Sequence, residues 1–446
     1  MDIKYFKLFY KILFSSLFIG LFLYITLFIL LKDTSNFYIC VDIQNLDLHI
    51  NSFKFQLNYP VSCDQSNYYM GFENMNNIIT SYEHPYQNRP LYILFVSIIS
   101  KFLNIMLSIF NIEINFLLQL STFIVQVFIV SIGILLILLS LNIYNLKFLK
   151  LLPLCGIVYL NPLIKWGIFV PSHQLLTFVV IASGLYILSS RCNYSLLKIS
   201  IIFGILFLAH RAFLLIYFLY IFREFLKKEE KFSYILENIK FLLIFILPNI
   251  FYLLYIRFLG YEPYDAATQY WGQFIWIGYY LIGIVKHSGQ WYCQTVPENF
   301  ICYFTDTLKT IFYMGIPILF SLFNFIVFGN PLKRKNKEFQ VNLILIIIIL
   351  FTFWAFIGWY PPLRFNLYSI GNGLMIVLLV QFIYLNKNIE KILFFFSLVF
   401  YFLFLNHWNY ENIIYIQPSY FLSILIMAIF YIVGYRNLNS GVGQNE

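Results

Sequence analysis

Long runs of apolar residues are the feature that most limits how this chain can fold. The run "VNLILIIIILFTFWAFIGW" at 341–359 contains no charged residue, and "LFSSLFIGLFLYITLFILL" at 13–31 is similar. An α-helix of about 20 apolar residues crosses about 30 Å of hydrocarbon. Because 61% of the residues are hydrophobic and only 11% are charged, a soluble domain is excluded. The runs predict a helical polytopic membrane protein.

We predict about twelve membrane-spanning helices in one all-α transmembrane domain covering residues 1–446. The spans are expected near 12–31, 116–140, 151–169, 174–190, 196–209, 210–222, 241–258, 308–328, 341–358, 364–384, 391–406 and 417–434. With this number of spans, both chain ends lie on the same side of the membrane. We expect a multi-pass protein of the inner or plasma membrane, part of the cell envelope, with both termini cytoplasmic.

Lysine and arginine set the expected orientation, because short loops rich in positive charge stay on the cytoplasmic side. The predicted cytoplasmic loops include "REFLKKEEK" at 223–231 and "KRKNK" at 333–337. The two long outside segments, 33–115 and 259–306, contain more acidic than basic residues. The formal net charge of +9 is therefore an orientation signal, and no nucleic-acid partner is predicted.

Two segments allow more than one assignment. Residues 90–110 form either a further span or, as we prefer, a juxtamembrane helix along the outer interface, because Lys101 lies in the middle of the segment. Residues 196–222 form either one long helix or two short spans that meet at "AHRAF" (209–213). Two spans keep the later basic loops inside, so we favour them.

Four cysteines lie in the predicted outside segments. Cys40 and Cys63 share the first segment, and Cys293 and Cys302 share the second. Each pair forms either a local disulfide or two free thiols in an oxidising compartment. The sequence leaves both alternatives open.

The order of these features resembles the GT-C superfamily, whose members are integral membrane glycosyltransferases that use polyprenyl-phosphate sugars. A first span is followed by an outside loop with an acid in "SCDQSNYYMGFE" and by "RPLY" at 89–92. The stretch 139–188, with "VPSHQL" near its centre, looks like the second to fourth spans of that family. "WYPPLRFNLYSIGNGLMIV" at 359–377 is similar to a family outer loop with an arginine beside an aromatic residue.

The resemblance implies transfer of a sugar from a polyprenyl-phosphate donor to a lipid, glycan or protein acceptor at the outer membrane face. Such transfer needs a carboxylate base, cationic groups for the departing phosphate and an apolar groove for the lipid tail. The resemblance places the catalytic aspartate on Asp64, with Glu73 and Glu83 as alternative bases. The expected substrate-binding residues are Glu83, His84, Arg89, His173, Gln174, His210, Arg211 and Arg364.

Metal dependence is where the chain departs from the family pattern. Many members carry a second acid in the outer loop that binds a metal or the acceptor, whereas this chain has His173 and Gln174 there. We assign no metal ligand and no certain cofactor, and a divalent metal stays an open alternative.

The alternative function is a transporter, flippase or polymerase of lipid-linked glycans. Transporters usually carry polar residues at mid-bilayer depth. Here the candidate residues cluster at the predicted outer helix ends, which favours an interfacial enzyme. The expected partners are a polyprenyl-phosphate sugar donor and membrane lipids.

The topology predicts opposite sidedness for Asn74 and Lys335. In a background without the six native cysteines, a membrane-impermeant thiol reagent should label Asn74→Cys in intact cells and Lys335→Cys only after lysis. Equal labelling of both positions in intact cells would rule out the proposed span arrangement.

Overall fold

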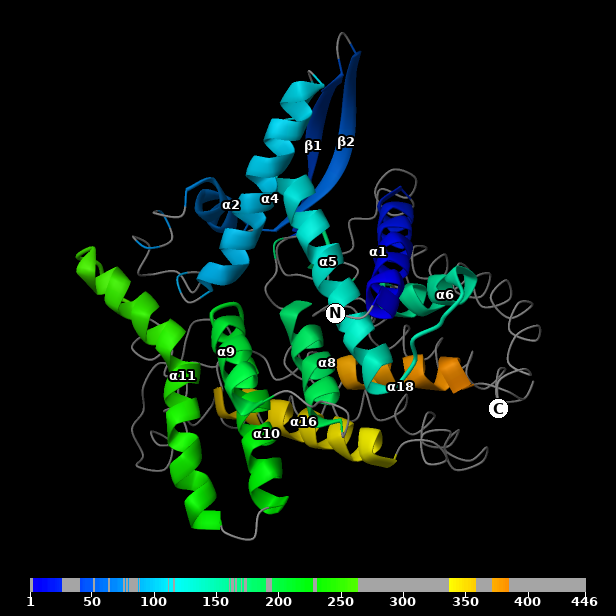
Figure 1. Cartoon of the computed structure of the whole chain (residues 1–446). Helices are drawn as coiled ribbons and strands as arrows, with labels where there is room; N and C mark the ends of the chain where they lie inside the picture. The colour runs from blue at the N-terminus through cyan, green and yellow to red at the C-terminus, as the bar shows by residue number, and fades with distance from the viewer. Residues whose placement is uncertain are drawn as a thin grey trace, which may run out of the picture.

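Figure 1 shows the computed structural model of the chain. The described residues are 3–25, 41–50, 53–62, 65–74, 77, 79, 87, 89–110, 112–114, 117–159, 161, 164, 167–169, 171, 175–189, 195–227, 231–263, 337–357 and 371–384. Helices dominate this part of the chain. The predicted spans 308–328, 391–406 and 417–434 lie outside it.

Four described helices are long and apolar enough to cross a membrane. They are α1 (Ile3–Tyr24), α4 (Pro90–Ile109), α5 (Leu117–Ser140) and α11 (Lys231–Phe258). By length and composition, the chain is an α-helical membrane protein, as predicted. The number of twelve spans, the orientation of the termini and the interfacial position of α4 stay predictions.

The remaining described helices pack around these four. They are α2 (Gln65–Glu73), α6 (Phe148–Tyr159), α8 (Leu176–Leu188), α9 (Leu196–Phe207), α10 (Phe213–Lys227), α16 (Lys337–Ile357) and α18 (Asn372–Tyr384). A continuous apolar core runs through most of them. Buried serines satisfy their hydroxyls within their own helices, as Ser131 does by donating to Val127 O at 2.7 Å.

The helix break predicted at "AHRAF" is present, because α9 ends at Phe207 and α10 begins at Phe213. The two helices run antiparallel. Ser200 and Tyr217 hydroxyls lie 2.9 Å apart in a hydrogen bond, and the rings of Phe203 and Phe213 meet edge to face. The turn at 208–212 therefore joins two short helices that lie side by side.

Helix α11 packs closely against this pair. A Cβ added at Gly204 of α9 would lie 2.5 Å from Phe245 O, so only glycine allows this approach of two backbones. The Phe245 ring stacks on the Tyr217 ring with centroids 4.3 Å apart. Glycine and aromatic stacking together fix the spacing of α9, α10 and α11.

A small antiparallel sheet accompanies the helices, with strand order β2-β1-β3. Its strands are β1 (Val41–Ile50), β2 (Phe53–Ser62) and β3 (Ile112–Ile114). In the β1–β2 register, Leu46 pairs with Leu57 and Leu48 pairs with Phe55. The all-α prediction is therefore incomplete. The sheet lies beside α4 at what we name the sheet end of the bundle (Figure 1).

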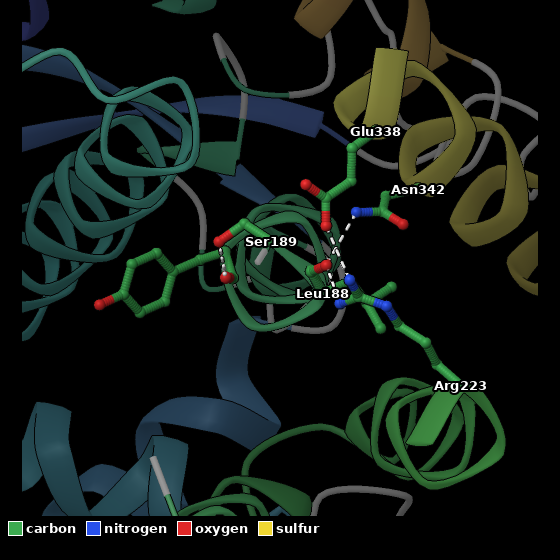
Figure 2. A network of polar contacts seen from close by, with 6 residues as sticks. Leu188, Ser189, Arg223, Glu338 and Asn342 are labelled. Carbon is green, nitrogen blue, oxygen red and sulfur yellow. Dashed lines mark hydrogen bonds and ion pairs between the residues drawn. The ribbon is translucent and has the colours of Figure 1, made fainter. Parts of the chain in front are cut away.

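A polar network ties α8, α10 and α16 together at the opposite end (Figure 2). The Arg223 guanidinium donates to Leu188 O and to Glu338 Oε1, the latter at 2.7 Å. Asn342 Nδ2 also donates to Leu188 O, at 3.0 Å. These donors satisfy a carbonyl at the end of α8 that no helical N–H reaches. The network brings the end of α10 next to the start of α16, and the side of the membrane on which they lie stays a prediction.

Two glycine substitutions test the packing of α9 against α11. Gly204→Ala should lower the free energy of unfolding by about 1–3 kcal/mol, because the added methyl group meets a backbone oxygen that cannot yield. Gly184→Ala is the control, since its Cβ meets only the terminal methyl groups of Ile216 and Ile346. In detergent, the melting temperature of Gly204→Ala should be lower than that of Gly184→Ala. The reverse order would contradict the packing.

Candidate functional site

Arg89 occupies the position before the first residue of α4. Pro90 starts the helix, and its fixed φ suits this position. The guanidinium has no acceptor atom and makes no capping hydrogen bond to α4. The backbone N–H of Leu91 instead donates to Leu208 O at 3.4 Å. The start of α4 is therefore attached to the turn between α9 and α10.

His210 lies in that turn and is 4% exposed. Its Nδ1 accepts a hydrogen bond from the Ala212 N–H at 3.2 Å, which leaves the proton of the neutral ring on Nε2. Burial and the nearby positive charge of Arg89 lower the pKa of His210 to about 3. His210 is therefore a neutral hydrogen-bond donor at neutral pH.

Arg89, His210 and Arg211 are three of the residues that the sequence singled out. The structure brings the first two together from distant segments, since Arg89 acts electrostatically on His210. Arg211 follows His210 in the turn and is exposed. One buried neutral ring and two arginines thus meet at this turn.

Beneath them lies a group of buried apolar residues that we name the junction cluster. Its members are Tyr68, Phe72, Tyr92, Ile93, Val96, Val125, Leu176 and Ala209. The Tyr92 ring makes edge-to-face contacts with Tyr68 and Phe72, at centroid distances of 6.0 and 6.1 Å. The Tyr92 hydroxyl also accepts a hydrogen bond from Gln126 Nε2 at 2.7 Å. The junction cluster joins segments that are far apart in sequence.

Four helices begin at the junction cluster. Tyr68 and Tyr92 lie in the first turns of α2 and α4, Leu176 is the first residue of α8, and Ala209 lies just before α10. Each start carries a partial positive charge equivalent to about half an elementary charge. Helices α9 and α11 end in the same region, at Phe207 and Phe258, and these ends carry the opposite partial charge. The four starts outnumber the two ends and Arg89 adds a full positive charge, so the region is favourable for an anion.

These helix starts also follow the predicted site residues in the sequence. In order, α2 follows Asp64, α4 follows Arg89, α8 follows His173 and Gln174, and α10 follows His210 and Arg211. Asp64, Glu83, His84, His173, Gln174 and Arg364 themselves lie outside the described residues. So do Cys40, Cys63, Cys293 and Cys302, and hence both candidate disulfides.

Metal ligands were sought in the described part of the chain. Within it, no group of three or more His, Cys, Asp or Glu side chains is placed to hold a metal ion. Cys155 is buried in α6 as a free thiol, and Ser16 donates to its sulfur at 3.8 Å. The described residues therefore assign no metal centre.

Gln87 is a residue of this region that the sequence analysis missed. Its side chain is 1% exposed, and Nε2 donates to Ile79 O at 2.9 Å and to Glu262 O at 3.1 Å. The Tyr252 hydroxyl donates to Gln87 O at 2.7 Å. Gln87 thus joins the chain before Arg89 to the end of α11. In sequence it is one polar residue in a polar segment, so no pattern marks it.

Comparisons with protein-family models, curated proteins and solved structures find no match for this chain. The resemblance to the GT-C superfamily therefore stays a prediction from sequence layout.

The lowered pKa of His210 predicts a dependence of stability on pH. The ordinary pKa of histidine is about 6.5. Between this pH and a pH of about 3, His210 binds a proton in the unfolded chain but not in the folded chain. Stability contributed by neutral His210 is present above this window and falls as pH falls through it. His210→Gln should therefore flatten the decrease in melting temperature between pH 7 and pH 5. Arg211→Gln, in the same turn, is the control and should keep the wild-type slope. A wild-type slope in His210→Gln would contradict a buried neutral histidine.

Proposed function

We propose that this chain is a GT-C-type membrane glycosyltransferase that moves a sugar from a polyprenyl-phosphate donor to a lipid, glycan or protein acceptor. The observation that carries the proposal is the gathering of four helix starts and Arg89 around one cluster at one end of the bundle. A phosphate that sits at the edge of hydrocarbon needs such positive groups, because it cannot enter the apolar layer without them.

The reaction sets the roles of the groups. The acceptor oxygen attacks the anomeric carbon, the bond from that carbon to the phosphate oxygen breaks, and the phosphate leaves with the electron pair. The acceptor proton passes to a carboxylate, which we assign to Asp64, one residue before α2 in the sequence. Arg89 stabilises the negative charge on the departing phosphate, and neutral His210 supplies a hydrogen bond from Nε2.

The exposed face of α4 supports a lipid-linked substrate. Pro90, Tyr92, Ile93, Val96, Ser97 and Ser100 form the buried face of this helix. On the other side Phe95, Ile98, Phe102 and Ile105 are more than half exposed. This apolar stripe starts within two turns of Arg89 and continues for about 15 Å along the helix. A polyprenyl chain that follows the stripe has its phosphate at the end where Arg89 lies.

A transporter, flippase or polymerase of lipid-linked glycans remains the second candidate. The feature that favours a transporter is the set of short helices α8, α9 and α10, because discontinuous helices whose starts face an anionic substrate are typical of secondary transporters. A transporter moves the lipid-linked sugar without breaking its bond to phosphate. Release of free polyprenyl phosphate therefore separates the two functions.

Asp64→Asn tests the proposed chemistry, because the amide keeps the shape of the side chain but cannot take a proton. Transfer should fall by at least about 100-fold, while the melting temperature stays that of wild type. The measurement is mass spectrometry of polyprenyl phosphate released from native lipid-linked sugars by the protein in nanodiscs. Glu73→Gln tests the alternative base in the same assay, and its release should stay near that of wild type if Asp64 is the base, because Glu73 is exposed at the end of α2. Wild-type release from Asp64→Asn would remove Asp64 from the mechanism, and no release from the wild type would favour the transporter.

A further inference from the structure

Thr177 in the first turn of α8 carries a buried hydroxyl without a hydrogen bond. The residue is 1% exposed, and within the described part of the chain its Oγ1 has no partner. Thr122 of α5 gives the contrast, because it is equally buried and donates to Leu118 O at 2.8 Å. A buried hydroxyl without a partner costs about 1–3 kcal/mol. The hydroxyl therefore does not stabilise the folded chain in this arrangement.

Contacts of α8 show which helices meet the face that carries Thr177. The helices run parallel, since Leu176 and Ala209 share the junction cluster, Gly184 faces Ile216, and Leu188 O meets Arg223 at the far end. Thr177 precedes Gly184 by two helical turns and so lies on the same face of α8. In the neighbouring segment, which leads into α10, Ala209 precedes Ile216 by the same number of residues. This face of α8 meets both α16 and α10, since a Cβ at Gly184 would lie 2.8 Å from Ile346 and 3.0 Å from Ile216. On the α10 side, the same face leads toward the turn 208–212, which holds His210.

The chemistry of this place suits an anion. The hydroxyl can donate one hydrogen bond, and the starts of α8 and α10 contribute partial positive charge beside it. Arg89 adds a full positive charge near His210. A cation would be repelled by all of these groups, whereas a phosphoryl oxygen would be stabilised by each of them.

Access to the hydroxyl requires a shift of the turn 208–212, because Thr177 and Ala209 are both buried. The hydrogen bond from Leu91 N–H to Leu208 O, which joins the turn to α4, is long at 3.4 Å. Arg211 on the turn is exposed and meets an incoming anion first. Binding thus exchanges one weak contact for several hydrogen bonds to charged oxygen.

We propose that Thr177 is a phosphoryl-binding residue, donating its hydroxyl hydrogen to the anionic ligand at a subsite between the first turn of α8 and the turn 208–212. The inference rests on the proposed function for its ligand, and it adds a residue that the sequence analysis did not select. The phosphoryl group comes either from a polyprenyl phosphate in the membrane or from free phosphate in solution.

The test compares Thr177→Val, Thr177→Ser and Thr122→Val in the full-length protein. Binding is measured with polyprenyl monophosphate in nanodiscs and, separately, with inorganic phosphate in solution. Thr177→Val should weaken binding by about 10-fold or more, the value of one hydrogen bond to a charged group, and Thr177→Ser should restore it. The melting temperature of Thr177→Val should equal or exceed that of wild type, whereas Thr122→Val should melt lower and bind normally.

Each outcome has a distinct meaning. Wild-type affinity of Thr177→Val for both probes overturns the inference, as does a loss of stability equal to that of Thr122→Val. An effect on inorganic phosphate alone supports the subsite and assigns it to the free anion. Arg89→Gln separates the two proposals. If Arg89→Gln binds polyprenyl phosphate weakly and Thr177→Val binds both probes normally, only this inference is wrong. If both variants bind both probes normally, the proposed function loses its site as well.

Discussion

The hydrogen bonding of helix ends is the constraint on which this structure depends. A helix in hydrocarbon satisfies its own backbone except at its two ends, where N–H and C=O groups need other partners. At one end of the bundle Arg223 and Asn342 supply donors to the Leu188 carbonyl. At the junction cluster the helices α2, α4, α8 and α10 begin, and their first N–H groups need acceptors, whereas α9 and α11 end nearby. The need of the helix starts for acceptors is the physical basis of the anionic ligand that we propose.

Placing Arg89 near these helix starts adds positive charge where the dipoles are already positive. The pKa of His210 is lowered to about 3, so the ring is neutral at neutral pH and adds no further positive charge. A charged histidine in the same place would need its own counter-ion. The histidine therefore contributes a hydrogen bond instead of a charge.

Sequence patterns predicted the local features well and the arrangement only in part. The apolar run predicted at 116–140 is α5 (Leu117–Ser140), and the break at "AHRAF" separates α9 from α10. The sheet was missed, although Leu46, Leu48 and Ile50 alternate with polar residues, because the polar residues of that segment were interpreted as an outside loop. Gln87 was missed for another reason. Its position depends on contacts with Glu262 and Tyr252, which no local pattern encodes.

The position of Arg89 illustrates why such contacts decide the site. The chain just before it is held by Gln87, which binds Ile79 from the first outside segment and Glu262 after α11. The chain just after it is attached to Leu208 through Leu91. Three segments that are distant in sequence therefore hold the backbone on both sides of Arg89. The same contacts fix where the segment 259–306, which we predict to lie outside, leaves the bundle. Because Glu262 lies against Gln87, that segment begins beside the start of α4, next to Arg89 and not across the bundle from it.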